Sequence, residues 1–182
     1  PGSRVSEIKK SIPVLIKTIK FLKQNSNINP HVLFYILPHL KKYFNNYRFN
    51  FPYSNINEND KYDAFKISDV SIASSGTATL ELSYFAIPTI VIYKINFLTY
   101  LIAKIFVKIK YANLLNILEK KYIIPEFLQF KCRPNLIAGE IIKLIKDKSY
   151  SKKHVLNAKK SLAKLKNYNN ELPSMSAVKE II

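Results

Sequence analysis

Residues 68–93, "SDVSIASSGTATLELSYFAIPTIVIY", limit the possible folds of this chain more than any other stretch. Two short apolar runs, residues 69–73 and 89–93, flank a helix-like segment at residues 76–86 that ends before Pro88. Buried strands joined by a helix are typical of a strand–helix–strand unit, in which the two strands run parallel. The stretch therefore predicts a parallel sheet.

The same alternation extends over the rest of the chain. We expect further helices at residues 6–24, 62–68, 97–108, 134–146, 151–166 and 174–182, a further strand at residues 31–37, and a loop at residues 52–61. Strands that alternate with helices predict an α/β fold, with a Rossmann-like parallel sheet covered by helices on both faces. We expect one such domain at residues 1–148 and a Lys-rich helical tail at residues 149–182.

The composition is strongly basic, with a formal net charge of +17. Three of the 29 basic residues are arginines (Arg4, Arg48 and Arg133), and the abundance of Lys, Ile and Asn is typical of a biased genome, which weakens the charge as a sign of function. The remaining excess still favours anionic partners. The single cysteine, Cys132, excludes an internal disulfide and fits a reducing compartment, so we expect a cytoplasmic protein.

The sequence predicts no signal peptide and no transmembrane helix. The start, "PGSRVSEIKK", has no apolar core, and the longest uncharged apolar stretch, residues 82–93, is too short to span a bilayer. The chain begins at Pro1, inside a motif, so we expect it to be part of a longer protein.

Gly76 is one of only three glycines, and it lies where a predicted strand turns into a helix. In open α/β sheets ligands bind beyond the carboxyl ends of the strands, and a glycine lets backbone amides at a helix N-terminus approach a phosphate. Ser75, Gly76 and Thr77 are therefore candidates for a phosphate loop, and Glu81, one turn later, for a carboxylate that binds sugar hydroxyls. The alternative is that Ser75 or Thr77 caps the helix and Glu81 lies on the surface.

The first residues form a second candidate. Gly2, Ser3 and Arg4 form a turn that leads into a helix, and an arginine there can bind a phosphate through two hydrogen bonds. The alternative is an ordinary turn with Arg4 exposed to solvent.

Five separated blocks resemble the lipid-A-disaccharide synthase family. They are "PGSRVSEIK", "SDVSIASSGTATLE", residues 88–93, "TYLIAKIFVKIKY" and "NILEKKYIIPEFLQFKCRP", and they occur in the family's order and spacing from Pro1 to about Ile145. The blocks correspond to the C-terminal half of these enzymes, which are glycosyltransferases with two Rossmann domains (the GT-B type). The N-terminal half is missing.

The resemblance implies a reaction and different roles for the N-terminal and C-terminal halves of the enzyme. The family joins UDP-2,3-diacylglucosamine to 2,3-diacylglucosamine 1-phosphate, releases UDP, and holds the donor mainly in the C-terminal domain. The donor site carried over to this chain comprises Gly2, Ser3, Arg4, Ser75, Gly76, Thr77, Glu81 and Asn116. Pro125, Glu126 and Gln129 match a further block, for which a structural role is equally expected.

No cofactor or metal is expected, because His31, His39 and His154 lack the spacing of metal ligands. The residue that deprotonates the acceptor would lie in the missing half, so no catalytic base is assigned. The chain also departs from the family, because "FPYSNINENDKYD" replaces a glycine-containing turn.

Parts of the sequence also suggest two other classes of protein. A nucleic-acid-binding domain needs clustered basic residues and arginines that read bases, whereas here lysines are spread over almost every helix, so we expect no nucleic-acid partner. A membrane-surface module is suggested by the stripe of Phe97, Leu101, Lys104 and Lys108, although a core helix with a solvated edge would look the same. A membrane-surface module is compatible with acylated substrates. We therefore expect peripheral binding to an anionic membrane surface, at the inner face of the inner membrane.

Overall fold

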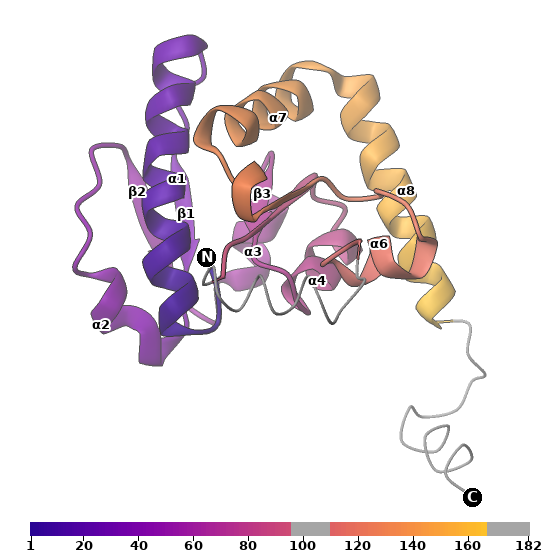
Figure 1. Ribbon diagram of the computed structural model, residues 1–182, viewed down its shortest axis with the longest axis horizontal. Coiled ribbons are helices and arrows are strands. Elements are labelled where there is room, and N and C mark those ends of the chain that lie inside the picture. The colour runs from indigo at the N-terminus through magenta and orange to yellow at the C-terminus, as the bar shows by residue number, and fades with distance from the viewer. Residues whose placement is uncertain (96–109, 167–182) are drawn as a thin grey trace, which may run out of the picture.

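The computed structural model describes residues 1–95 and 110–166, in which helices alternate with parallel strands (Figure 1). The helices are α1 (Val5–Asn25), α2 (Lys41–Phe44), α3 (Lys61–Lys66), α4 (Ala78–Tyr84), α6 (Leu114–Glu119), α7 (Pro134–Lys146) and α8 (Lys148–Lys166). Two short 3-10 helices are η1 (Pro38–Leu40) and η2 (Gln129–Lys131). The strands are β1 (Val32–Tyr35), β2 (Tyr53–Ile56), β3 (Ser71–Ala73), β4 (Thr89–Tyr93) and β5 (Glu126–Leu128). The predicted helices at residues 97–108 and 174–182 lie outside the described residues.

The strands form two parallel sheets, β1–β2 and β3–β4–β5. Figure 1 shows α1 beside β1 and β2 at one end of the molecule and α8 at the other end. The α/β class with parallel strands is confirmed, and the sheet is divided into two parts.

Strand β4 has helices on both faces, because successive side chains of a strand point to opposite sides. Ile90 and Ile92 pack in the main core with apolar residues of α1 and α7. Val91 points the other way and packs with Leu115 of α6 and Ala158 of α8. The side chains of Ile90, Val91 and Ile92 are fully or almost fully buried, which accounts for the unbroken apolar run in the sequence.

The predicted loop at residues 52–61 is wrong in its first half, where β2 pairs in parallel with β1 from Tyr53 to Ile56. The strand is polar because its side chains alternate between exposed and half-buried, without a continuous apolar run. An aromatic cluster holds it in place: the Phe49 ring lies 4.8 Å from Tyr53 and 5.1 Å from Phe34 of β1. Packing with residues distant in the sequence therefore overrides the local loop signal.

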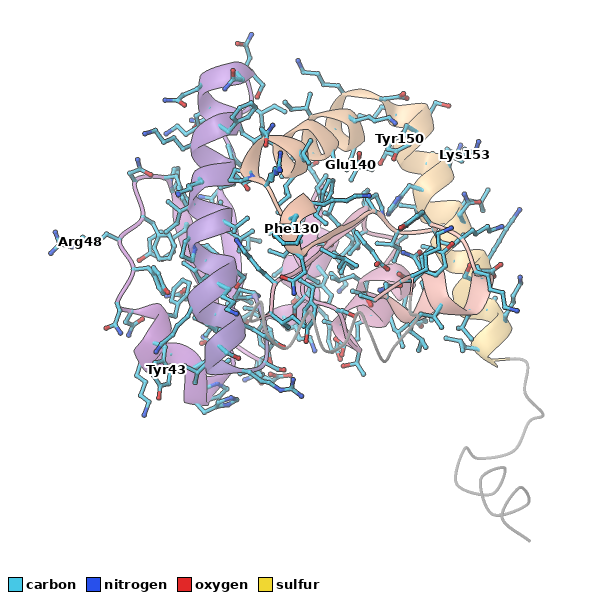
Figure 2. All side chains as sticks on the ribbon, viewed as in Figure 1. Tyr43, Arg48, Phe130, Glu140, Tyr150 and Lys153 are labelled. Atoms are coloured by element: carbon cyan, nitrogen blue, oxygen red, sulfur yellow. The ribbon has the colours of Figure 1, made fainter. Side chains whose placement is uncertain are left out.

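The C-terminal helix α8 packs against α4, α6 and α7. Tyr150 joins it to α7, because its hydroxyl donates to Glu140 at 2.7 Å (Figure 2). His154 is buried and accepts from the amide of Thr89 at 3.2 Å, and burial lowers its pKa to about 4, so it is neutral at pH 7. None of the described helices combines the length and apolar character needed to cross a bilayer.

Candidate functional site

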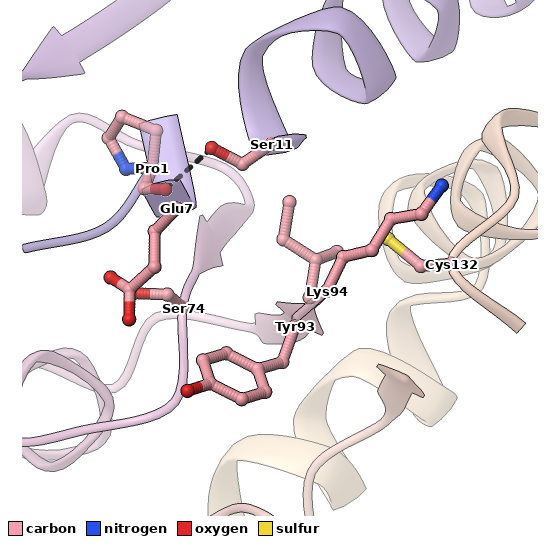
Figure 3. Close-up of a pocket in the computed structure, with 8 residues that line it drawn as sticks. Pro1, Glu7, Ser11, Ser74, Tyr93, Lys94 and Cys132 are labelled. Atoms are coloured by element: carbon pink, nitrogen blue, oxygen red, sulfur yellow. Dashed lines mark hydrogen bonds between the residues drawn. The ribbon is translucent and has the colours of Figure 1, made fainter. Parts of the chain in front are cut away.

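A small pocket lies at the carboxyl edge of the second sheet, where β3 and β4 end (Figure 3). Ser74 directly follows β3, Tyr93 is the last residue of β4, and Lys94 follows it. The start of α1 forms the opposite wall, but none of the predicted donor-binding residues lines this pocket. The complete lining is Pro1, Glu7, Ser11, Ser74, Ile92, Tyr93, Lys94 and Cys132.

The turn at Gly2 is closed by a side chain of its own helix. Glu7 accepts a hydrogen bond from the amide of Ser3, with its Oε2 at 2.7 Å from that nitrogen. A carboxylate near a helix N-terminus satisfies a free amide and complements the helix dipole. Arg4 stands at the N-cap position with extended backbone, and its side chain is exposed.

Gly2 is required here by internal packing. Its φ is +136°, and a Cβ atom at this position would lie 2.5 Å from Cβ of Glu7. No L-residue fits without moving Glu7, so the packing around the turn explains the glycine without reference to a ligand.

The turn at Gly76 also has a glycine with positive φ, but its surroundings differ. Its φ is +152°, but a Cβ atom at this position would have no neighbour within 4 Å. Within the described residues, the amides of Gly76, Thr77 and Ala78 donate to no acceptor. Gly76, Thr77 and Ala78 are also exposed, so a ligand can reach these amides from solvent.

Buried and partly buried hydrogen bonds anchor the Gly76 turn to the segment that precedes α6. Ser75 donates to the carbonyl of Ala112 at 2.5 Å, and Thr79 donates to the carbonyl of Gly76 at 2.7 Å. The side-chain Nδ2 of Asn113 donates in turn to the hydroxyl of Thr79 at 2.7 Å. Thr79 and Asn113 were not predicted from the sequence, and they hold the turn through segments that are far apart in the chain.

Asn116 is fully buried, and its side-chain amide bonds within the protein. Its oxygen accepts from the amides of Ile123 and Ile124 at 2.7 and 2.8 Å. Its nitrogen donates to the carbonyl of Ile124 at 2.7 Å and to Glu126 at 2.6 Å. Asn116 thus holds the chain that enters β5.

Glu126 completes this network at the start of α6. Its two carboxylate oxygens accept from the amides of Ala112 and Asn113 at 2.8 and 2.7 Å. A carboxylate in this position satisfies amides that a helix start leaves free. The sequence block around Glu126 therefore has a clear structural function.

Glu81 lies in the first turn of α4 and forms an ion pair with Lys61. The Nζ atom of Lys61 is 2.6 Å from Oε2 of Glu81, and the Glu81 side chain is 35% exposed. The candidate sugar-binding carboxylate is therefore accessible and held from one side.

The pocket also contains groups that the sequence did not single out. Lys94 is exposed at the end of β4, where an ammonium group can attract an anion. Cys132 is buried, and burial raises the pKa of its thiol although Lys94 opposes this effect. Among residues 1–95 and 110–166, no group of three or more His, Cys, Asp or Glu side chains could hold a metal ion.

Comparison with known proteins identifies relatives over the whole chain. A family model described as "Lipid-A-disaccharide synthetase" matches residues 1–181. Lipid-A-disaccharide synthase of Rickettsia prowazekii (strain Madrid E) is 34% identical over 187 residues, which covers 99% of this chain and 48% of the relative. The Rickettsia canadensis (strain McKiel) protein of the same name is 36% identical over 186 residues, or 100% of this chain and 47% of the relative. The chain thus spans about half the length of these curated relatives, and it belongs to the lipid-A-disaccharide synthase family.

Proposed function

We propose that this chain is the donor-binding part of a lipid-A-disaccharide synthase. The whole enzyme would join UDP-2,3-diacylglucosamine to 2,3-diacylglucosamine 1-phosphate and release UDP. The family match over residues 1–181 carries this proposal. The position of the Gly76 turn supports it, because this turn follows β3 at the carboxyl edge of the sheet, where α/β proteins bind nucleotides.

Within this proposal each candidate group has one role. The free amides of the Gly76 turn, together with Ser75 and Thr77, bind the diphosphate, and Arg4, Ser3 and Gly2 approach it from the start of α1. Glu81 binds the hydroxyls of the ribose. Asn116 contributes indirectly, by holding Glu126 and thereby the segment to which the Gly76 turn is anchored.

The chemical step would need the other half of the enzyme. In this proposal helix dipoles and Arg4 stabilise the departing UDP, whereas the catalytic base and most of the acceptor site lie in the N-terminal half. We therefore expect the 182-residue chain to release no UDP when it is incubated with both lipid substrates.

We also propose peripheral binding to an anionic membrane surface. Helix α6 exposes Leu114, Ile117 and Leu118, each at least 41% accessible, and exposed Lys120 and Lys121 follow it. Apolar side chains next to lysines suit a lipid surface. Binding to anionic vesicles should weaken as salt increases, and salt-resistant binding would contradict the electrostatic part of this proposal.

Calorimetric titration with UDP and uridine tests the donor site. Arg4→Ala should weaken UDP binding by about 1.5–3 kcal/mol and spare uridine, because a hydrogen bond to a charged group is lost. Glu81→Gln should weaken the binding of both ligands by a smaller amount.

Gly76→Val should abolish UDP binding, since its side chain enters space that no protein atom fills within 4 Å.

Arg48→Ala is the matched control for Arg4→Ala. Arg48 is an exposed arginine that points away from the body of the protein (Figure 2), so its loss should leave both affinities unchanged. If Arg4→Ala and Glu81→Gln weaken UDP and uridine alike, the separate phosphate and ribose roles are wrong.

A further inference from the structure

Lys61, the first residue of α3, lies in an unusual setting for a lysine of this chain. Its ammonium nitrogen is 5.3, 5.1 and 5.9 Å from the ring centroids of Tyr35, Tyr62 and Phe65. Its side chain is 13% exposed, whereas the lysines of the other ion pairs among the described residues are at least 64% exposed. The rings therefore confine the ammonium group to one position.

That position connects the two sheets beside the candidate site. Tyr35 ends β1 in the first sheet, and Glu81 lies in the helix that follows β3 of the second sheet. Partial burial alone would lower the pKa of Lys61, but the hydrogen bond and charge of Glu81 outweigh it and raise the pKa above its usual value. Lys61 is thus a cation at neutral pH.

A partly buried ion pair contributes little net stability, because removing both charges from water offsets most of their attraction. What this pair does provide is orientation. Lys61 contacts Oε2 of Glu81 at 2.6 Å, while no described residue donates to Oε1. One oxygen is held by the protein, and the other is left to accept hydrogen bonds.

We propose that Lys61 is a positioning residue, which holds the Glu81 carboxylate so that its second oxygen accepts hydrogen bonds from the vicinal hydroxyls of a nucleoside ribose. This inference rests on the proposed donor site and adds to it a residue that acts through Glu81.

A double-mutant cycle with uridine and UDP tests the proposal. Lys61→Met removes the charge but keeps most of the apolar stem, and it should weaken both ligands by the same factor, about three- to tenfold. In the Glu81→Gln background the same substitution should have no further effect, because its target is gone. Lys61→Arg should restore most of the affinity.

Lys66→Met is the matched control. Lys66 lies on the same helix and pairs with Asp63 at 2.8 Å, but its side chain is 64% exposed and distant from Glu81, so neither affinity should change. Should Lys61→Met fail to fold in a thermal melt, Lys61→Gln replaces it with the same expected outcomes.

Four results would overturn the inference. Weaker UDP binding with uridine spared would show that Lys61 contacts phosphate itself, and an equal loss in the Glu81→Gln background would show that it acts independently of Glu81. If Glu81→Gln weakens uridine binding but Lys61→Met leaves it unchanged, the Lys61–Glu81 ion pair has a structural role only. If the parent chain binds neither ligand, the proposed donor site itself fails, and this inference fails with it.

Discussion

The turns at Gly2 and Gly76 look alike in the sequence and differ in the structure. Each places a glycine with positive φ just before a helix. At Gly2 a Cβ atom would overlap Glu7, and Glu7 already accepts from the amide of Ser3. At Gly76 the space is open, and the amides of Gly76, Thr77 and Ala78 are unused within the described residues.

A glycine before a helix can therefore be required either by packing within the protein or by the approach of a ligand to the backbone amides. The Gly2 turn satisfies its helix start internally, through its own carboxylate. The Gly76 turn leaves its helix start unsatisfied but is anchored from behind by Ser75, Thr79 and Asn113. A rigid turn with free amides is what an anion site requires.

Breaking the anchor should have the largest effect. Asn116→Leu keeps the side-chain volume but leaves the amides of Ile123 and Ile124 buried without a partner. We expect a loss of about 4 kcal/mol in the free energy of unfolding, because each unsatisfied buried group costs about 1–3 kcal/mol. Urea unfolding measures this loss.

Asn25→Ala provides the control for Asn116→Leu. Asn25 is an exposed asparagine with a single hydrogen bond to the carbonyl of Phe21, so its replacement should change stability by less than about 0.5 kcal/mol. If Asn116→Leu lowers the free energy of unfolding by no more than Asn25→Ala does, the Gly76 turn does not depend on the hydrogen bonds of Asn116.

Alanine at each glycine compares the two turns directly. Gly2→Ala should reduce the free energy of unfolding by about 3 kcal/mol, from backbone strain and overlap with Glu7. Gly76→Ala should cost about 1 kcal/mol, from backbone strain alone. Equal losses, again measured by urea unfolding, would remove the distinction between the turns.

Glu7→Gln produces the smallest expected change and tests whether the Gly2 turn faces the same anion. The substitution removes the charge that complements the start of α1, which should cost about 0.5–1 kcal/mol of stability. If both turns face the diphosphate, UDP affinity should increase about two- to fivefold, since a nearby negative charge is lost. Unchanged affinity in a calorimetric titration would leave the Gly76 turn as the anion-binding end of the site.

Local signals predicted much of the fold. β4 and α7 have the expected bounds, because an unbroken apolar run follows Pro88 and because Pro134 suits the first turn of a helix. The sequence missed β2, α6 and β5. These elements are short, and β2 and β5 are half-polar, so pairing with β1 and β4 stabilises them rather than their own composition.

The sequence by itself determined the α/β class, the family and the position of a glycine turn at the end of β3, because apolar periodicity, prolines and motif spacing are local properties. Only the tertiary structure decided how each candidate residue is used. It assigned Gly2 to packing against Glu7, buried Asn116 in a hydrogen-bond network, and brought Lys61 to within 2.6 Å of Glu81. The Lys61–Glu81 contact joins helices α3 and α4, which lie on either side of β3 in the sequence, and no local pattern encodes that proximity.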